Sequence, residues 1–133
     1  FLRKALIGKT LQLPVAVDIE DLGQTVIGKD KLTDLAAYCL STVESWGVYA
    51  MLYTGLYFGR TYLYMTGAAL KPYDVWLAAY RSVKPSTDFA YGMWQYTNEG
   101  KISGVSKGVD LNHAYKDYPA IIKRAGLTRI KEV

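Results

Sequence analysis

Two acidic side chains at the end of an apolar segment are the first candidates for chemistry in this sequence. Asp18 and Glu20 close the segment LPVAVDIED, residues 13–21, whose alternating β-branched residues are typical of a buried parallel strand. Side chains two positions apart on a strand point to the same face, so we expect the two carboxyl groups to lie together. A neighbouring negative charge and partial burial both raise a carboxyl pKa, which would make one of the pair a proton donor near neutral pH. A pair of solvated carboxylates at a strand end, or a helix cap, is the alternative interpretation.

Aromatic and amide side chains form a second group of candidates. Trp94 and Tyr96 share one face of a predicted strand, and Asp110 and Asn112 share one face of the next. An aromatic surface beside acids and amides suits a sugar ring, whose apolar face stacks while its hydroxyls form hydrogen bonds. Burial in the core is the alternative for these aromatics, and it applies equally to Tyr53, Trp76 and Tyr80. The chain has 12 tyrosines, and because each buried hydroxyl needs a partner, we expect some of them to line a polar cleft.

Composition argues against several other classes of protein. The net charge of +4 comes from scattered basic residues, and no nucleic-acid-binding motif accompanies it. Cys39 is the single cysteine and is expected in the core, while the single His113 has no second soft ligand beside it, so we expect no metal site and no cofactor. His113 is interpreted as a structural or exposed residue, with a catalytic base as the weaker alternative. No segment has the length and apolarity of a membrane span.

The elements that would position these residues alternate between strands and helices. The chain opens with helical character that breaks at Gly8, and a long amphipathic helix is expected after a loop, capped by Asp30 and ended by Gly47. Asp117, with Pro119 just inside, begins a last helix that Gly126 ends. Strands are expected in residues 13–21, 48–54, 71–80 and 90–97 and from 109 onward, with a short helix in 55–65. This order predicts an α/β fold with a largely parallel sheet.

Four segments in order, LPVAVDIED, YAMLYT, VWLAAY with MWQYT, and GVDLN, resemble the glycosyl hydrolase family 25 lysozymes. The resemblance runs from residue 1 to about 127 and includes a D-x-E at a strand end, a W-Q-Y-T strand and a terminal V-D-x-N. It implies an incomplete (β/α) TIM-like barrel with its site at the C-terminal face. It also implies hydrolysis of the β-1,4 bond between N-acetylmuramic acid and N-acetylglucosamine in bacterial peptidoglycan.

The resemblance also implies roles for particular residues. Glu20 matches the general acid, and Asp18 matches a neighbouring carboxylate that orients the substrate acetamido group or assists a water. Asp110 matches an acid of the last strand that reaches the cleft. The expected substrate-binding residues are Asp110, Tyr53, Trp94 and Tyr80.

Family members begin with a further strand that carries another site aspartate, followed by two more strands, and these do not occur in this sequence. We therefore expect residues 1–133 to be a single, partial catalytic domain, the C-terminal two-thirds, in which the N-terminal strands are missing. The expected partners are a peptidoglycan glycan strand and a second chain or copy that supplies the missing strands, with no nucleic acid and no membrane. The expected location is secreted or associated with the cell wall, in a bacterial or phage-encoded protein. An inactive peptidoglycan-binding fragment is the alternative function.

Overall fold

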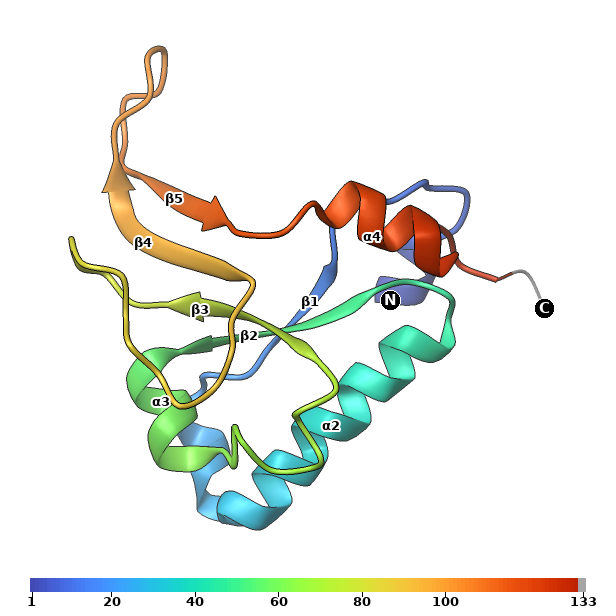
Figure 1. Cartoon of the computed structure of the whole chain (residues 1–133), viewed down its shortest axis with the longest axis horizontal. Helices are drawn as coiled ribbons and strands as arrows, with labels where there is room; N and C mark the ends of the chain where they lie inside the picture. Colours follow the sequence, from blue (N-terminus) through green and yellow to red (C-terminus); the bar gives the residue numbers. More distant parts are fainter. Residues whose placement is uncertain (132–133) are drawn as a thin grey trace.

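The protein folds as one five-stranded sheet flanked by helices, in a computed structural model that describes residues 1–131 (Figure 1). The strand order follows the chain, β1-β2-β3-β4-β5. Strands β1 to β4 are parallel to their neighbours, and β5 returns antiparallel to β4 as a hairpin. The strands are β1 (Val15–Asp18), β2 (Ala50–Gly55), β3 (Asp74–Ala78), β4 (Met93–Gly100) and β5 (Val109–Ala114). The expectation of an α/β fold with a largely parallel sheet is confirmed.

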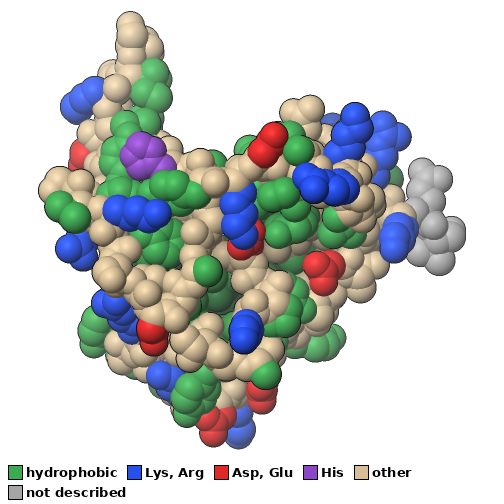
Figure 2. Space-filling model, in the orientation of Figure 1, with side chains coloured by type: hydrophobic (Ala, Val, Ile, Leu, Met, Phe, Trp, Pro, Cys, Tyr) green, Lys and Arg blue, Asp and Glu red, His purple; other side chains and the backbone are tan. Residues whose placement is uncertain are grey.

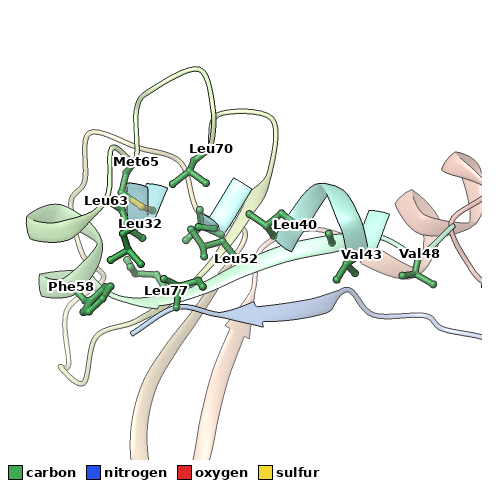
Figure 3. Packing of buried hydrophobic residues seen from close by; sticks show 14 of the residues in the cluster. Leu32, Leu40, Val43, Val48, Leu52, Phe58, Leu63, Met65, Leu70 and Leu77 are labelled. Carbon is green, nitrogen blue, oxygen red and sulfur yellow. The ribbon is translucent and has the colours of Figure 1, made fainter. Parts of the chain in front are cut away.

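Helices α2 (Lys29–Ser45) and α3 (Leu56–Tyr62) cover one face of the sheet and enclose the main core (Figure 3). Leu32, Ala36 and Leu40 recur with helical spacing and are fully buried against strand residues Leu52 and Leu77. Gly47 ends α2 with a φ of +93°, a conformation that favours glycine. The predicted long helix and its C-terminal stop are therefore correct.

The last helix, α4 (Tyr118–Ala125), packs with a second, smaller cluster. Its fully buried Tyr118 and Ile122 pack with Met51 of β2. Met51 precedes the core residue Leu52, so its side chain points to the face opposite the main core. The predicted signals all hold: Asp117 caps the first turn, Pro119 lies just inside, and Gly126 adopts the left-handed conformation at the end. The helix α4 therefore packs on the side of the sheet opposite α2 and α3, at the end where β2 begins (Figure 1).

A buried carboxylate ties this second cluster together at the start of β3. Asp74 accepts hydrogen bonds from the hydroxyls of Tyr49 (3.2 Å) and Tyr118 (3.1 Å) and from Nζ of Lys116 (2.7 Å). The Asp74 side chain is 10% exposed, whereas that of Lys116 is 44% exposed. Burial, and then the charge and hydrogen bond of Asp74, raise the pKa of Tyr49 to about 12. A cavity of about 590 Å³ adjoins this cluster.

Several local expectations were wrong. Asp30 does not cap α2, because the helix already begins at Lys29, after Gly28, and Asp30 lies in its first turn. The predicted loop before α2 contains a 3-10 helix, η1 (Leu22–Ile27), whose cap is Asp21. Cys39 is only half-buried, because it faces the edge of the molecule beside β1 instead of the centre of the core.

The outer edge of β1 carries no strand among the described residues. The backbone N–H of Val15 donates to the carbonyl of Tyr49, and that of Ile19 donates to the carbonyl of Tyr53. Because N–H groups alternate along a strand, those of Ala16 and Asp18 point away from β2, toward the open edge. A shallow groove of about 370 Å³ runs along this edge between β1, α2 and the short α1 (Leu2–Leu6). Two of the side chains that line this groove, Leu2 and Tyr38, are large, apolar and exposed.

Across residues 1–131, no helix has the length and apolarity needed to cross a bilayer. Figure 2 shows Lys and Arg side chains spread over several elements of the visible face. The mild positive charge is therefore not concentrated in one continuous patch on that face.

Candidate active site

The carboxyl end of β1 holds the two predicted acids beside β2. Ile19, between them, is 4% exposed, its N–H donates to the carbonyl of Tyr53 (3.0 Å), and its carbonyl accepts from the Thr54 hydroxyl (2.8 Å). This double attachment fixes the backbone of Ile19 with its side chain in the core. Asp18 and Glu20, on either side of it, project to the opposite face, and Asp18 is in register with Tyr53.

Partial burial favours the protonated forms of both acids, and the charge of Asp18 adds to this effect at Glu20. Partial burial raises the pKa of Asp18 above its usual range. The pKa of Glu20 is raised first by burial and then by the negative charge of Asp18. Both side chains are exposed, and the pKa of Glu20 shifts in the direction that favours a proton donor.

Tyr53 links the carboxyl pair to β4. Its hydroxyl donates to Oε1 of Gln95 (2.7 Å), and the Tyr80 hydroxyl donates to the same oxygen (2.9 Å). Burial, Tyr80 and the charges of Glu20 and Asp18 all raise the pKa of Tyr53, so its hydroxyl lies within the field of both acids. Residues from β1, β2, β4 and the segment after β3 thus meet on one face of the sheet.

An aromatic pair extends this surface toward β5. The rings of Tyr53 and Trp76 meet edge to face with centroids 5.0 Å apart. The Trp76 indole N–H donates to Oδ1 of Asn112 (2.8 Å) and is thereby fixed in orientation. Trp76 remains half-exposed, so it can offer an apolar surface to a ring-shaped ligand.

The structure does not bring Trp94 to this group. Trp94 precedes Gln95 on β4, so its side chain points to the other face, where it is 5% exposed and its indole N–H donates to the carbonyl of Ala79 (2.8 Å). Tyr96 lies near Trp94, and the exposed His113 stacks on Tyr96 with ring centroids 4.6 Å apart. Trp94 and Tyr96 do share a face, but it is not the face of Asp18, Tyr53 and Gln95.

Asp110 lies on β5 two residues before Asn112, on the same side of the strand. It is exposed, and the described residues offer it neither a hydrogen bond nor an ion pair. Within residues 1–131, no group of three His, Cys, Asp or Glu side chains is arranged to hold a metal ion.

Gln95 is the residue of this group that sequence reasoning missed. It is 3% exposed and accepts two hydrogen bonds, so its polar side chain is part of the site and not of the apolar core. The available signal was a polar residue inside the apolar strand MWQYT, on the opposite face from its tryptophan.

Comparison with known proteins matches residues 1–105 to the family model described as Glycosyl hydrolases family 25. The chain belongs to this family. The match includes the D-x-E strand, Tyr53, Tyr80 and Gln95, whereas Asp110 lies beyond it.

Relatives and solved structures agree with this assignment. The chain is 28% identical over 106 residues to the autolytic lysozyme of Clostridium acetobutylicum, a match that covers 79% of this chain and 31% of that protein. The spore cortex lytic enzyme SleM of Clostridium perfringens, known from a crystal structure, shares 28% sequence identity with this chain. Its fold matches with a TM-score of 0.66, over 77% of this chain and 37% of that one. The CTP1L endolysin, at 23% identity, has a similar fold, with a TM-score of 0.71 over 93% of this chain and 42% of that one. The chain spans about a third of the length of the curated relatives it matches.

Proposed function

We propose that this chain is part of a lysozyme-type glycoside hydrolase that cleaves the β-1,4 bond between N-acetylmuramic acid and N-acetylglucosamine in peptidoglycan. The observation that carries the proposal is Glu20, whose pKa is raised at a strand end beside Asp18 and next to an aromatic surface. Membership of family 25 and the similarity to an autolytic lysozyme and a spore cortex lytic enzyme support it.

In the proposed reaction, Glu20 donates its proton to the glycosidic oxygen as the bond from that oxygen to the anomeric carbon breaks. The sugar on the oxygen side leaves as an alcohol, and a water adds its hydroxyl to the anomeric carbon. The proton that this water gives up restores the protonated form of Glu20, directly or through solvent. Asp18 serves either to assist that water or to orient the acetamido group of the substrate. Its negative charge also raises the pKa of Glu20, which keeps the acid protonated closer to neutral pH.

Tyr53, Tyr80 and Trp76 are proposed to line the sugar site, because their rings and hydroxyls lie on the same face as the acids. Asp110 is proposed to reach the substrate from β5, since it shares a side of that strand with Asn112, which contacts Trp76. Trp94 is left out of the proposed site because it is buried on the other face.

The open edge of β1 is proposed to bind a further strand from a second chain or a second copy. Unpaired backbone groups, a groove of about 370 Å³ and exposed apolar side chains coincide along this edge. We therefore propose that residues 1–133 form one part of a catalytic domain that acts at the bacterial cell wall.

The same open edge favours a second candidate function, an inactive fragment that binds peptidoglycan. The sugar-binding surface formed by Tyr53, Trp76 and Tyr80 does not depend on a further strand, whereas hydrolysis would be weakened if a wall of the cleft came from elsewhere.

Digestion of purified peptidoglycan separates these candidates. Borohydride reduction of the products followed by mass spectrometry should show reduced N-acetylmuramic acid at the new ends. Reduced N-acetylglucosamine in its place would show that the other glycosidic bond is cut. Binding to the insoluble wall without release of any reducing ends would favour the non-catalytic function.

A further inference from the structure

Trp76 holds the side-chain amide of Asn112 in one of its two possible orientations. The indole Nε1 of Trp76 lies 2.8 Å from Oδ1 of Asn112. An indole nitrogen can only donate a hydrogen bond, so the atom that faces it must be the carbonyl oxygen of the amide. The two N–H groups of the Asn112 amide therefore point away from Trp76.

Asn112 lies on the face of the sheet that carries the proposed acids. Asp18, Tyr53 and Trp76 occupy one register row across β1, β2 and β3. On β5, Asn112 is paired with Gln95 of β4, whose side chain contacts Tyr53 on this same face. The surface thus runs from the acids over the aromatic pair and reaches Asn112 at its far side.

The amide nitrogen of Asn112 is available to a ligand. Asn112 is exposed, and no oxygen of residues 1–131 accepts a hydrogen bond from this nitrogen. The half-exposed Trp76 beside it is held by its edge-to-face contact with Tyr53 and by its bond to Asn112. A fixed ring beside fixed donors suits a sugar, because the ring covers the apolar face of the sugar while the donors satisfy its oxygens.

We propose that Asn112 is a substrate-binding residue, whose amide N–H groups donate to an oxygen of the N-acetylated sugar that rests against Trp76. This inference rests on the proposed function and adds a contact with the substrate from β5. The bond to Trp76 gives the contact its direction: the amide turns its donors and not its carbonyl oxygen toward the sugar. Because the amide is oriented before the sugar arrives, little side-chain freedom is lost on binding.

Asn112→Asp separates the two hydrogen bonds of this side chain. The aspartate keeps the shape and an oxygen that accepts from Trp76, but it has no N–H group to donate. Titration calorimetry with a neutral oligosaccharide of N-acetylglucosamine measures the effect in the 133-residue chain, and the added negative charge meets no charge on this probe. We expect the dissociation constant to rise about 3- to 10-fold, which corresponds to the loss of one neutral hydrogen bond.

His113→Gln is the matched control. His113 is the next residue of β5, is also exposed, and points to the other face, where it stacks on Tyr96. The affinity of this variant for the oligosaccharide should equal that of the wild type. NMR of the wild-type chain provides a second measurement that needs no variant: the side-chain NH₂ signals of Asn112 should shift as the oligosaccharide is added.

Equal dissociation constants for the wild type and a folded Asn112→Asp variant would overturn the inference and leave the proposed function standing. The same holds if the NH₂ signals of Asn112 stay in place while the wild-type chain binds the oligosaccharide. An equal loss of affinity in His113→Gln would assign the effect to the strand and not to the amide donors, and would also refute the inference. A wild-type chain that binds no oligosaccharide would contradict the sugar surface of the proposed function itself, and the role of Asn112 with it.

Discussion

Replacement of Asp74 by asparagine should destabilise the fold without touching the proposed site. Asp74 lies at the start of β3, whereas Asp18 and Glu20 lie at the end of the parallel strand β1, so the two groups are at opposite ends of the sheet. The carboxylate accepts hydrogen bonds from Tyr49, Tyr118 and Lys116. The asparagine side chain would keep one acceptor oxygen and lose the charge.

The cost follows from these three contacts. A hydrogen bond to a charged group contributes about 1.5–3 kcal/mol and a neutral one about 0.5–1.5 kcal/mol, so the two tyrosine contacts lose about 1 kcal/mol each. The Lys116 bridge adds less than about 1 kcal/mol, because the lysine side chain is 44% exposed. The free energy of unfolding should therefore fall by about 2–3 kcal/mol. For a chain of this size, the melting midpoint should drop by about 6–10 °C.

Urea unfolding followed by tryptophan fluorescence measures this loss, and Lys116→Met is the matched control. The control removes only the exposed bridge and should cost less than about 1 kcal/mol. A loss below about 1 kcal/mol for Asp74→Asn, or equal losses for the two variants, would show that the buried tyrosine contacts do not depend on the charge.

Three further predictions concern the site and the open edge. The pKa of Glu20 is raised in the folded chain above its ordinary value of 4.5. Between 4.5 and the raised pKa, the native state binds more protons than the unfolded state, so the free energy of unfolding falls as pH rises through this range. Glu20→Gln should therefore raise the melting midpoint at neutral pH but not in acid below the ordinary pKa, and a lower midpoint at neutral pH would contradict the raised pKa of this group. Asp110→Asn should lower wall lysis and leave the melting midpoint within about 1 °C, since surface changes cost little; a drop of several degrees with unchanged activity per folded molecule would make the residue structural. The isolated 133-residue chain should self-associate in light scattering, or require a fragment that pairs with β1, and should hydrolyse peptidoglycan poorly alone; a monodisperse, cooperatively melting and fully active monomer would contradict this.

Local signals in the sequence were enough for most elements. Asp117, Pro119 and Gly126 define the last helix because capping and the left-handed glycine act within a few residues. The alternation of Asp18, Ile19 and Glu20 likewise separates the acids from the core, since strand geometry alone sets which side chains share a face.

What the sequence could not decide depended on contacts between distant residues. Strand alternation places Trp94 and Tyr96 on a common face, but it does not tell which face of β4 meets β2. That is set by the contact of Gln95 with Tyr53, 42 residues earlier in the chain. The link between Asp74 and Tyr118, 44 residues apart, depends on the position of α4 against the sheet. The prediction of Asp30 as a cap rests on its side-chain type alone, whereas in the structure η1 ends at Ile27 and Gly28 is the residue that precedes α2.

The most direct test of the account is wall hydrolysis by Glu20→Gln, in a preparation where the wild-type chain is active, with a second chain or copy added if it is needed. The glutamine keeps the shape of the side chain but cannot deliver a proton. We predict that release of reducing ends from purified peptidoglycan falls by at least about 100-fold, the usual contribution of a general acid, while the circular dichroism spectrum is unchanged. Hydrolysis at the wild-type rate by a folded Glu20→Gln variant would contradict the central claim that Glu20 is the proton donor.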